Sequence, residues 1–330
     1  MESVKNTTLV AQKEKKKLGN SVQQFLAFGS LVILVVFFSI ASPNFLQWSN
    51  FIGILLSTAV IGILALGATF VIITGGIDLS VGTVMTLSSV LTGLIVVSAD
   101  LPIVLGVIGG IATGALCGML CGVAITKLQI PPFIATLAMM MIAKGLALVL
   151  SDATPIYFTD YPTFSKIALG NIIPGVDIPN AVILFFILGI IAAVILSKTI
   201  LGRFNFAIGS NEEATKLSGI NVDRWKIAIY GLAGTFTGIA GVIMASRLNS
   251  AQPALGQGYE LEAIAAVVIG GTSLSGGKGT IVGTIIGALI MSVLTNGLRV
   301  LSIPQEWQTV VVGIVIIFAV FMDILRRRKN

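Results

Sequence analysis

Charged residues are almost absent from the first part of this chain. Between Leu18 and Thr126 the only two are Asp78 and Asp100. The sequence around them falls into long apolar runs, and an apolar run of about 20 residues is what a helix needs to cross about 30 Å of hydrocarbon. Over the whole chain 55% of the 330 residues are hydrophobic and 10% are charged, against roughly 25% charged residues in soluble domains. The chain is therefore expected to span a membrane.

Apolar runs of helical length recur to the end of the chain, and alternating strand patterns of the barrel type are absent. They predict an all-α, polytopic transmembrane bundle with about ten spans and a weak internal repeat. The spans are expected near residues 25–40, 51–73, 81–97, 101–125, 133–150, 180–196, 227–245, 261–271, 281–294 and 308–321. The eighth is short and has Glu262 at its entrance, which indicates a half-helix covered by other parts of the protein.

Basic residues predict the orientation. Lysines and arginines gather before the first span, in alternate loops and after the last span, so the positive-inside rule places both termini in the cytoplasm. The chain then divides into a cytoplasmic tail at 1–24, a transmembrane domain at 25–322 with a cytoplasmic loop at 197–226, and a basic tail at 323–330. Because the basic residues border spans, a lipid bilayer is the expected partner and nucleic acid is not.

Several kinds of chemistry are excluded by residue type. The chain has no histidine, which removes imidazole catalysis and most zinc or haem sites. Cys117 and Cys121 lie one turn apart in an apolar run and are interpreted as packing residues. The segment 272–279 approaches the phosphate-binding pattern GxxxxGK[ST] but lacks its first glycine and its final Ser or Thr. Neither a metal, nor a cofactor, nor ATP is expected on this chain.

Glycines line one face of the fourth predicted span. They recur every four residues, at Gly110, Gly114, Gly118 and Gly122. A row of glycines lets a neighbouring helix backbone approach closely. We therefore expect this face to pack against another helix.

The loop at 197–226 is the most polar internal stretch. Within it the segment from Ser210 to Glu213 has the pattern of a capping box, and Gly219 is a suitable helix stop. A two-turn helix is predicted between them. A helix this short is unstable alone, so it must dock either on its own bundle or on a cytoplasmic partner, and the pattern leaves both open.

Motifs that recur in order along the chain resemble those of the ribose-type permease subunits of bacterial ATP-binding cassette (ABC) sugar importers, within the branched-chain amino acid/ribose-type permease family. The resemblance covers roughly residues 25–325. The matching segments are 75–82 (GGIDLSVG), 132–137 (PFIATL), 201–203 (LGR), 207–214 (AIGSNEEA), 217–222 (LSGINV), 251–253 (AQP), 258–261 (GYEL), 263–268 (AIAAVV), 270–274 (GGTSL), 276–280 (GGKGT) and 296–298 (NGL).

The resemblance implies a fold, a location and partners. It implies a bacterial inner-membrane permease that works with a second permease subunit, cytoplasmic ATPase subunits that use ATP, and an extracytoplasmic sugar-binding protein. It also implies that the short helix is the coupling helix, seated in a groove of the ATPase. The residues that would form this helix are Ser210, Asn211, Glu212, Glu213, Ala214, Leu217, Ser218 and Gly219.

Asp78 has three competing interpretations. It could line the sugar path, cap the following helix through the amides near Ser80, or pair with a distant cation. The segment 75–82 has a second copy at 270–277, in which Ser273 occupies the position of Asp78; serine is also a good cap, so the repeat favours capping. Residues expected at the path or at these caps are Asp78, Ser80, Thr83, Ser273 and Asn296.

The function predicted from the sequence is an alternating-access path for a monosaccharide, ribose or a similar sugar, with no bond-breaking chemistry of its own. The alternative is a self-sufficient, ion-coupled secondary transporter of a small polar solute. Such a transporter would need an ionisable network across several helices, and the sequence shows almost none beyond Asp78. An intramembrane enzyme is not expected, because no nucleophile and base occur together.

Overall fold

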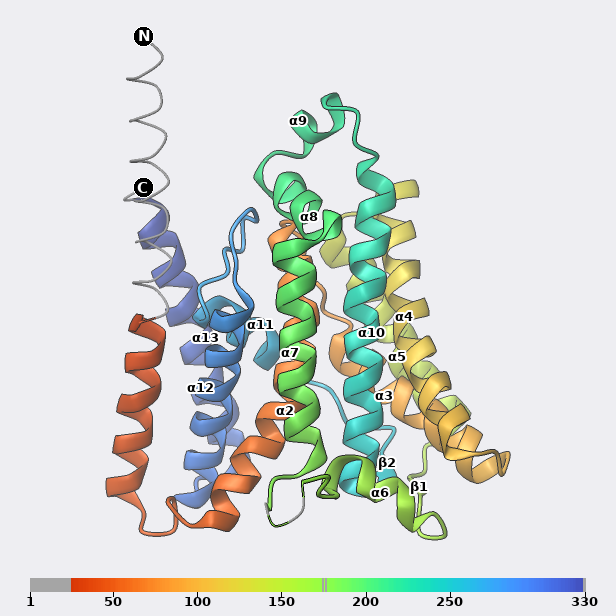
Figure 1. Cartoon of the computed structure of the whole chain (residues 1–330), viewed down its shortest axis with the longest axis vertical. Helices are drawn as coiled ribbons and strands as arrows, with labels where there is room; N and C mark the ends of the chain where they lie inside the picture. Colours follow the sequence, from red (N-terminus) through yellow and green to blue (C-terminus); the bar gives the residue numbers. More distant parts are fainter. Residues whose placement is uncertain (1–24, 174, 176, 329–330) are drawn as a thin grey trace.

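The computed structural model describes residues 25–173, 175 and 177–328. Within this part the regular secondary structure is helical apart from one pair of short strands (Figure 1). After a first helix over Phe25–Ala41 the elements are α2 (Trp48–Ile73), α3 (Val81–Gly93), the π-helix η1 (Leu94–Ser98), α4 (Ile103–Lys127), α5 (Pro132–Leu150), β1 (Ile156–Tyr157), α6 (Pro162–Leu169), α7 (Asn180–Lys198), α8 (Ile200–Ser210), α9 (Glu212–Leu217), α10 (Val222–Leu248), β2 (Ser250–Ala251), α11 (Tyr259–Ile269), α12 (Ile281–Val300) and α13 (Gln305–Arg328).

Eight helices are long and apolar enough to cross a membrane, with α3 and η1 forming one of them. They coincide with eight of the ten predicted spans. The other two predicted spans correspond to the shorter helix Phe25–Ala41 and to α11, which has 11 residues. A polytopic helical membrane protein and a short eighth helix are thus confirmed, while the count of ten and the side of the termini stay predictions.

The two predicted tails have different outcomes. The tail at 1–24 lies outside the described residues. The segment 323–328, predicted as part of the basic tail, continues helix α13.

The bundle has two distinct ends. Helices α8 and α9 lie at one end, called here the α9 end (Figure 1). At the opposite end, the β1 end, β1 pairs antiparallel with β2, so that Ile156 faces Ala251, and α6 lies beside them.

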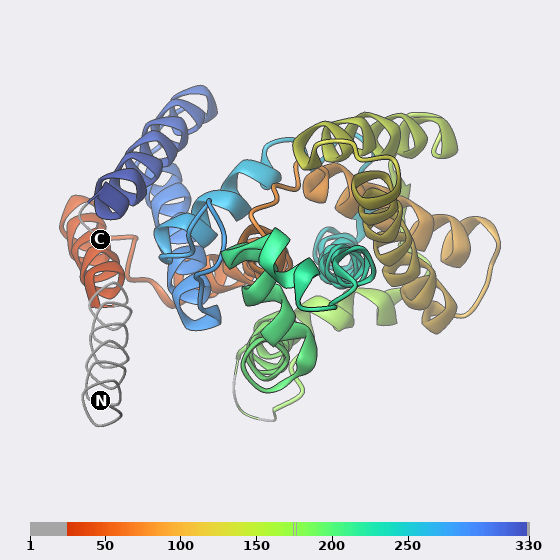
Figure 2. The ribbon, with the colours of Figure 1, turned by 90° about the horizontal axis from the view of Figure 1, so that it is seen from above.

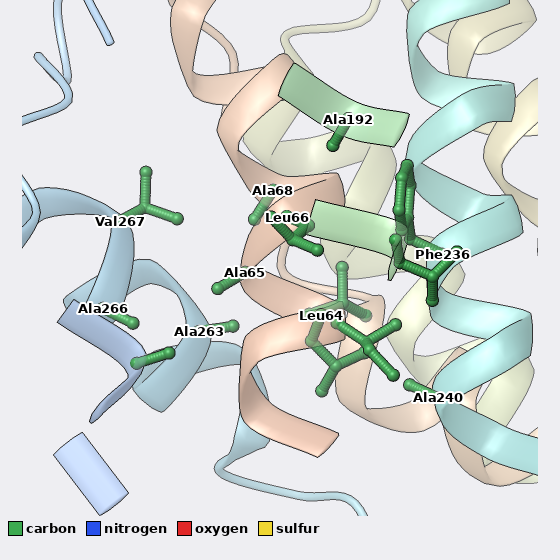
Figure 3. Close-up of a cluster of buried hydrophobic side chains, with 14 of the residues drawn as sticks. Leu64, Ala65, Leu66, Ala68, Ala192, Phe236, Ala240, Ala263, Ala266 and Val267 are labelled. Carbon is green, nitrogen blue, oxygen red and sulfur yellow. The ribbon is translucent and has the colours of Figure 1, made fainter. Parts of the chain in front are cut away.

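Helix α2 forms the centre of the bundle. In its most apolar stretch 89% of the residues are buried, as expected for a helix that is hydrophobic all round. It contacts α7, α10, α11 and α12 (Figure 2). Leu64 and Leu66 of α2 lie in one apolar cluster with Phe236 of α10 and Ala263 of α11 (Figure 3). This cluster holds the half-helix α11 against the central span.

The predicted glycine face of α4 packs against α10. A Cβ atom on Gly114 would collide with the backbone of Gly234 and Gly238, and one on Gly118 would collide with the carbonyl of Tyr230. The two backbones are therefore as close as glycine allows, and the prediction from the glycine spacing is confirmed.

Candidate functional site

Helix α2 ends in a turn that only glycine adopts easily. Gly75 has φ +81°, its amide donates to Ile72 O at 2.9 Å, and the Gly76 amide donates to Val71 O at 3.3 Å. This is the Schellman arrangement of a helix C-terminus. The chain then runs without regular structure to α3, which begins at Val81.

Helix α11 ends in the same turn. Gly271 has φ +93°, its amide donates to Val268 O at 2.9 Å, and the Thr272 amide donates to Val267 O at 3.1 Å. Gly271 therefore plays the part of Gly75, whereas the sequence motif aligns Gly75 with Gly270. The shift by one residue separates Ser273 from the structural position of Asp78.

The irregular segment between α11 and α12 contacts the end of α2. The Gly277 amide donates to Ile73 O at 2.9 Å. Gly209 of α8 lies against both groups, because a Cβ there would collide with the Ile73 carbonyl and approach the Gly277 amide. Helix α8 thus packs directly against the end of α2 and against the segment before α12.

Asp78 is 5% exposed and is bound within its own turn. Its Oδ1 accepts from the Ser80 amide at 2.8 Å and from Ser80 Oγ at 2.6 Å. Ser80 is the residue directly before α3, so the carboxylate stabilises the approach to that helix. Among the described residues no lysine or arginine forms an ion pair with Asp78, which leaves the capping interpretation with direct contacts and the distant-cation interpretation without any.

The prediction that Ser273 caps the following helix is wrong. Helix α12 begins at Ile281, and its N-cap is Thr280, whose Oγ1 accepts from the Gly283 amide at 3.1 Å. The Oγ of Ser273 instead lies 3.2 Å from Ser275 Oγ, and the Ser273 amide donates a hydrogen bond to Lys278 O. The segment between them turns at Gly276 and Gly277, both with positive φ, so Ser273 is too far along the chain to reach the first amides of α12.

Thr83 and Asn296 lie on different helices. Thr83 is buried, donates to Ser80 O at 3.1 Å, and lines a very small cavity between α3 and α5. Asn296 lies in α12, and its Oδ1 has no hydrogen-bond partner among the described residues. The structure does not bring these two residues together.

One polar residue escaped the sequence interpretation. Lys144 lies within α5, and its Nζ donates to Gln257 Oε1 at 3.2 Å. Together with Thr83 and Thr86 these two side chains line the same small cavity. The signal was present, since an isolated lysine inside an apolar span is rare and is retained for a function.

We expect the Asp78 carboxylate to act through its hydrogen bonds rather than through its charge. Asp78→Asn keeps an oxygen acceptor for the Ser80 amide, whereas Asp78→Ala removes both bonds, at about 1 kcal/mol each. Thermal unfolding and substrate uptake should therefore stay near wild type for Asn and fall for Ala. An equal loss in the two variants would contradict this and indicate a role that needs the charge.

The short helix α9 forms as predicted, with one correction at its start. The cap is Asn211, whose Oδ1 accepts from the Ala214 amide at 2.9 Å. Ser210, predicted as the first residue of the capping box, is the last residue of α8. It is unable to cap because the chain becomes extended only at Asn211, with φ −162°. Gly219, with φ +81°, ends the helix as predicted.

One side of α9 is held by the bundle and the other is open. Thr215 is buried, whereas Leu217 is 89% exposed. Glu212 pairs within the chain, with Lys226 Nζ at 2.7 Å and Lys216 Nζ at 3.7 Å. Ala214, Glu213 and Ser218 are exposed. The exposed side of α9, with Leu217 at its end, is therefore available for contact with a partner protein.

Comparisons with known proteins agree on one family. The family described as "Branched-chain amino acid transport system / permease component" matches residues 50–320. The ribose import permease protein of Bacillus subtilis is 47% identical over 99% of this chain and 100% of its own length. The ribose import permease protein of Escherichia coli K12 is 42% identical over 89% and 91%, and the xylose transport system permease protein of Haemophilus influenzae is 32% identical over 94% and 98%. No solved structure gives a significant match.

Proposed function

Because the chain belongs to the family of branched-chain amino acid transport system permease components, we propose that it is the membrane-spanning permease subunit of an ABC importer for a monosaccharide, ribose or a similar sugar. It is a multi-pass protein of the bacterial inner membrane and a transport component rather than an enzyme. The observation that carries the substrate class is the 47% identity, over 99% of the chain, to a ribose import permease.

Partners supply what this chain lacks. ATP is used by a separate cytoplasmic ATPase subunit, and a sugar-binding protein delivers the substrate from outside. A second permease subunit completes the path. The α9 end is then cytoplasmic and the β1 end faces the binding protein.

Coupling follows from the contacts of α8 and α9. Leu217 and Ala214 of α9 would enter a groove of the ATPase, with Glu213 at its rim. Movement of the ATPase then reaches α8, and Gly209 of α8 lies directly against Ile73 and the Gly277 amide. The end of α2 and the segment before α12 are then displaced together. A rigid helix can in this way transmit a domain movement to a path that opens alternately to each side.

Transport in proteoliposomes tests this function against the alternative of a secondary transporter. The permease, its ATPase and its binding protein are expected to accumulate labelled ribose only when ATP is present on the ATPase side. The permease alone is expected to accumulate nothing under a proton or sodium gradient. Accumulation by the permease alone would overturn the proposal, and exchange of ribose for xylose in the complete system reports on the substrate.

A further inference from the structure

A cavity between the membrane-spanning helices is separate from Asp78. It has a volume of about 460 Å³ and lies where α11, α12 and α13 meet the half of α2 nearer the β1 end. Helices α11, α12 and α13 lie on one side of the central helix α2, at one edge of the bundle (Figures 1 and 2). Its polar lining includes Arg247, Gln257, Glu262, Thr295, Arg299 and Gln308. The volume is in the range of small-molecule sites, roughly 300 to 1,000 Å³.

The charges that line this cavity do not neutralise one another by direct contact. Among the described residues, neither Glu262 nor Arg299 forms a salt bridge, and their side chains make no hydrogen bond to protein. Arg247 is held by Leu56 O and Ser57 Oγ, each at 3.3 Å. Glu262 is partly buried, whereas Arg299, near the C-terminal end of α12, is exposed. Both side chains therefore keep their hydrogen-bonding atoms available for a ligand.

The mixture of groups points to a neutral, polyhydroxylated ligand. Every hydroxyl of a sugar both donates and accepts, so it needs carboxylate or amide oxygens together with guanidinium or amide donors. Glu262 supplies the acceptor, Arg299 the donor, and the amides of Gln257 and Gln308 supply both. The two arginines disfavour an amine. They also outnumber the single glutamate, so inorganic phosphate is included as a competing ligand in the test below.

The Asp78 turn lacks these properties. Both polar contacts of its carboxylate are made within the turn, to Ser80, and Asp78 lines neither this cavity nor the small one beside Lys144. Gln257 lines both cavities. The polar surface therefore continues from the large cavity toward α3 and α5 without passing Asp78.

We propose that the cavity around Glu262 and Arg299 is a binding station for a monosaccharide on its way through the permease. Glu262 accepts hydrogen bonds from the sugar hydroxyls, and Arg299 donates to their oxygens. Arg247, in the last turn of α10, positions the wall formed by Ser57. The inference rests on the proposed function, which supplies the sugar and the direction of entry from the β1 end.

Thiol protection tests the station in the assembled transporter. Thr295→Cys places one accessible thiol in the cavity wall, because the native Cys117 and Cys121 are buried. In proteoliposomes that contain the permease, ATPase and binding protein, saturating ribose is expected to slow maleimide labelling by about threefold or more, since few sites then remain empty. Thr309→Cys on the facing helix α13, which also lines the cavity, provides a second reporter in case the first variant assembles poorly.

The matched controls are two glutamate substitutions on neighbouring helices. In either reporter background Glu262→Gln should abolish ribose protection, whereas Glu306→Gln, an exposed position that does not line the cavity, should preserve it. Protection by inorganic phosphate instead of ribose would overturn the proposal in favour of an anion site. ATP-driven ribose uptake without any protection would also overturn it while leaving the proposed function intact; absence of uptake would count against the function itself.

Discussion

Leu217→Asp combined with Glu213→Lys is expected to abolish transport while leaving the bundle folded. Leu217 is 89% exposed, so its replacement loses no packing within this chain. In the complex the new carboxylate would have to enter an apolar groove, and a loss of about 3 kcal/mol at such a central contact lowers ATPase binding by roughly 100-fold. Co-purification of the ATPase with tagged permease and ATP-driven uptake measure the effect.

The control for this variant is a single leucine-to-aspartate substitution at the other end of the molecule. Leu169→Asp in α6 also replaces an exposed leucine, 44% exposed, and lies at the β1 end. It should leave ATPase co-purification unchanged. If the α9 variant still binds the ATPase at the wild-type level, α9 is not the coupling helix and its exposed leucine needs another explanation.

Gly114→Ala is expected to destabilise the fold even though it adds a single methyl group. The new Cβ would collide with backbone atoms of Gly234 and Gly238, and backbone is unable to move aside as a side chain does. Overpacking of this kind costs about 1 to 3 kcal/mol, and here it outweighs the gain of up to about 1 kcal/mol from replacing glycine in a helix. A lower melting temperature and a lower yield of monodisperse protein in detergent are the expected results.

Gly145→Ala gives the matched control. Gly145 lies in α5, within another membrane-spanning helix, and a Cβ there meets no atom within 4 Å. This variant should melt at or slightly above the wild-type temperature. Equal destabilisation of both variants would show that helix flexibility rather than the close approach of α4 and α10 requires glycine.

The sequence predicted well what depends on local pattern. Each long apolar run became a helix, since a run of that length has no other way to satisfy its backbone in a bilayer. Gly219 ended α9 as predicted, because the αL turn at a helix C-terminus is a property of a few adjacent residues. The short eighth predicted span, which is α11 in the structure, followed from the few residues between Glu262 and the glycines at 270 and 271.

Predictions that depended on the exact position of a residue relative to a helix end were less accurate. The motif at 270–277 aligned Ser273 with Asp78, but the helix-ending turns differ by one residue and Thr280 caps α12. Ser210 was displaced as a cap by its neighbour Asn211. In both cases the side chain chosen was suitable, and only the backbone conformation decided which residue stood next to the helix.

The sequence by itself determined that this chain is a bundle of membrane helices, with a glycine face on α4 that packs closely against another helix and a short polar helix in an internal loop, because apolar length, glycine spacing and turn residues act over a few neighbours. Only the tertiary structure decided that α10 is the helix against which α4 packs, and that the end of α2 at Ile73 contacts the segment before α12 at Gly277. It also decided that Glu262, Arg299 and Arg247 share one cavity. These residues are far apart in the chain, and their proximity depends on how α10, α11 and α12 pack around α2, which no local pattern encodes.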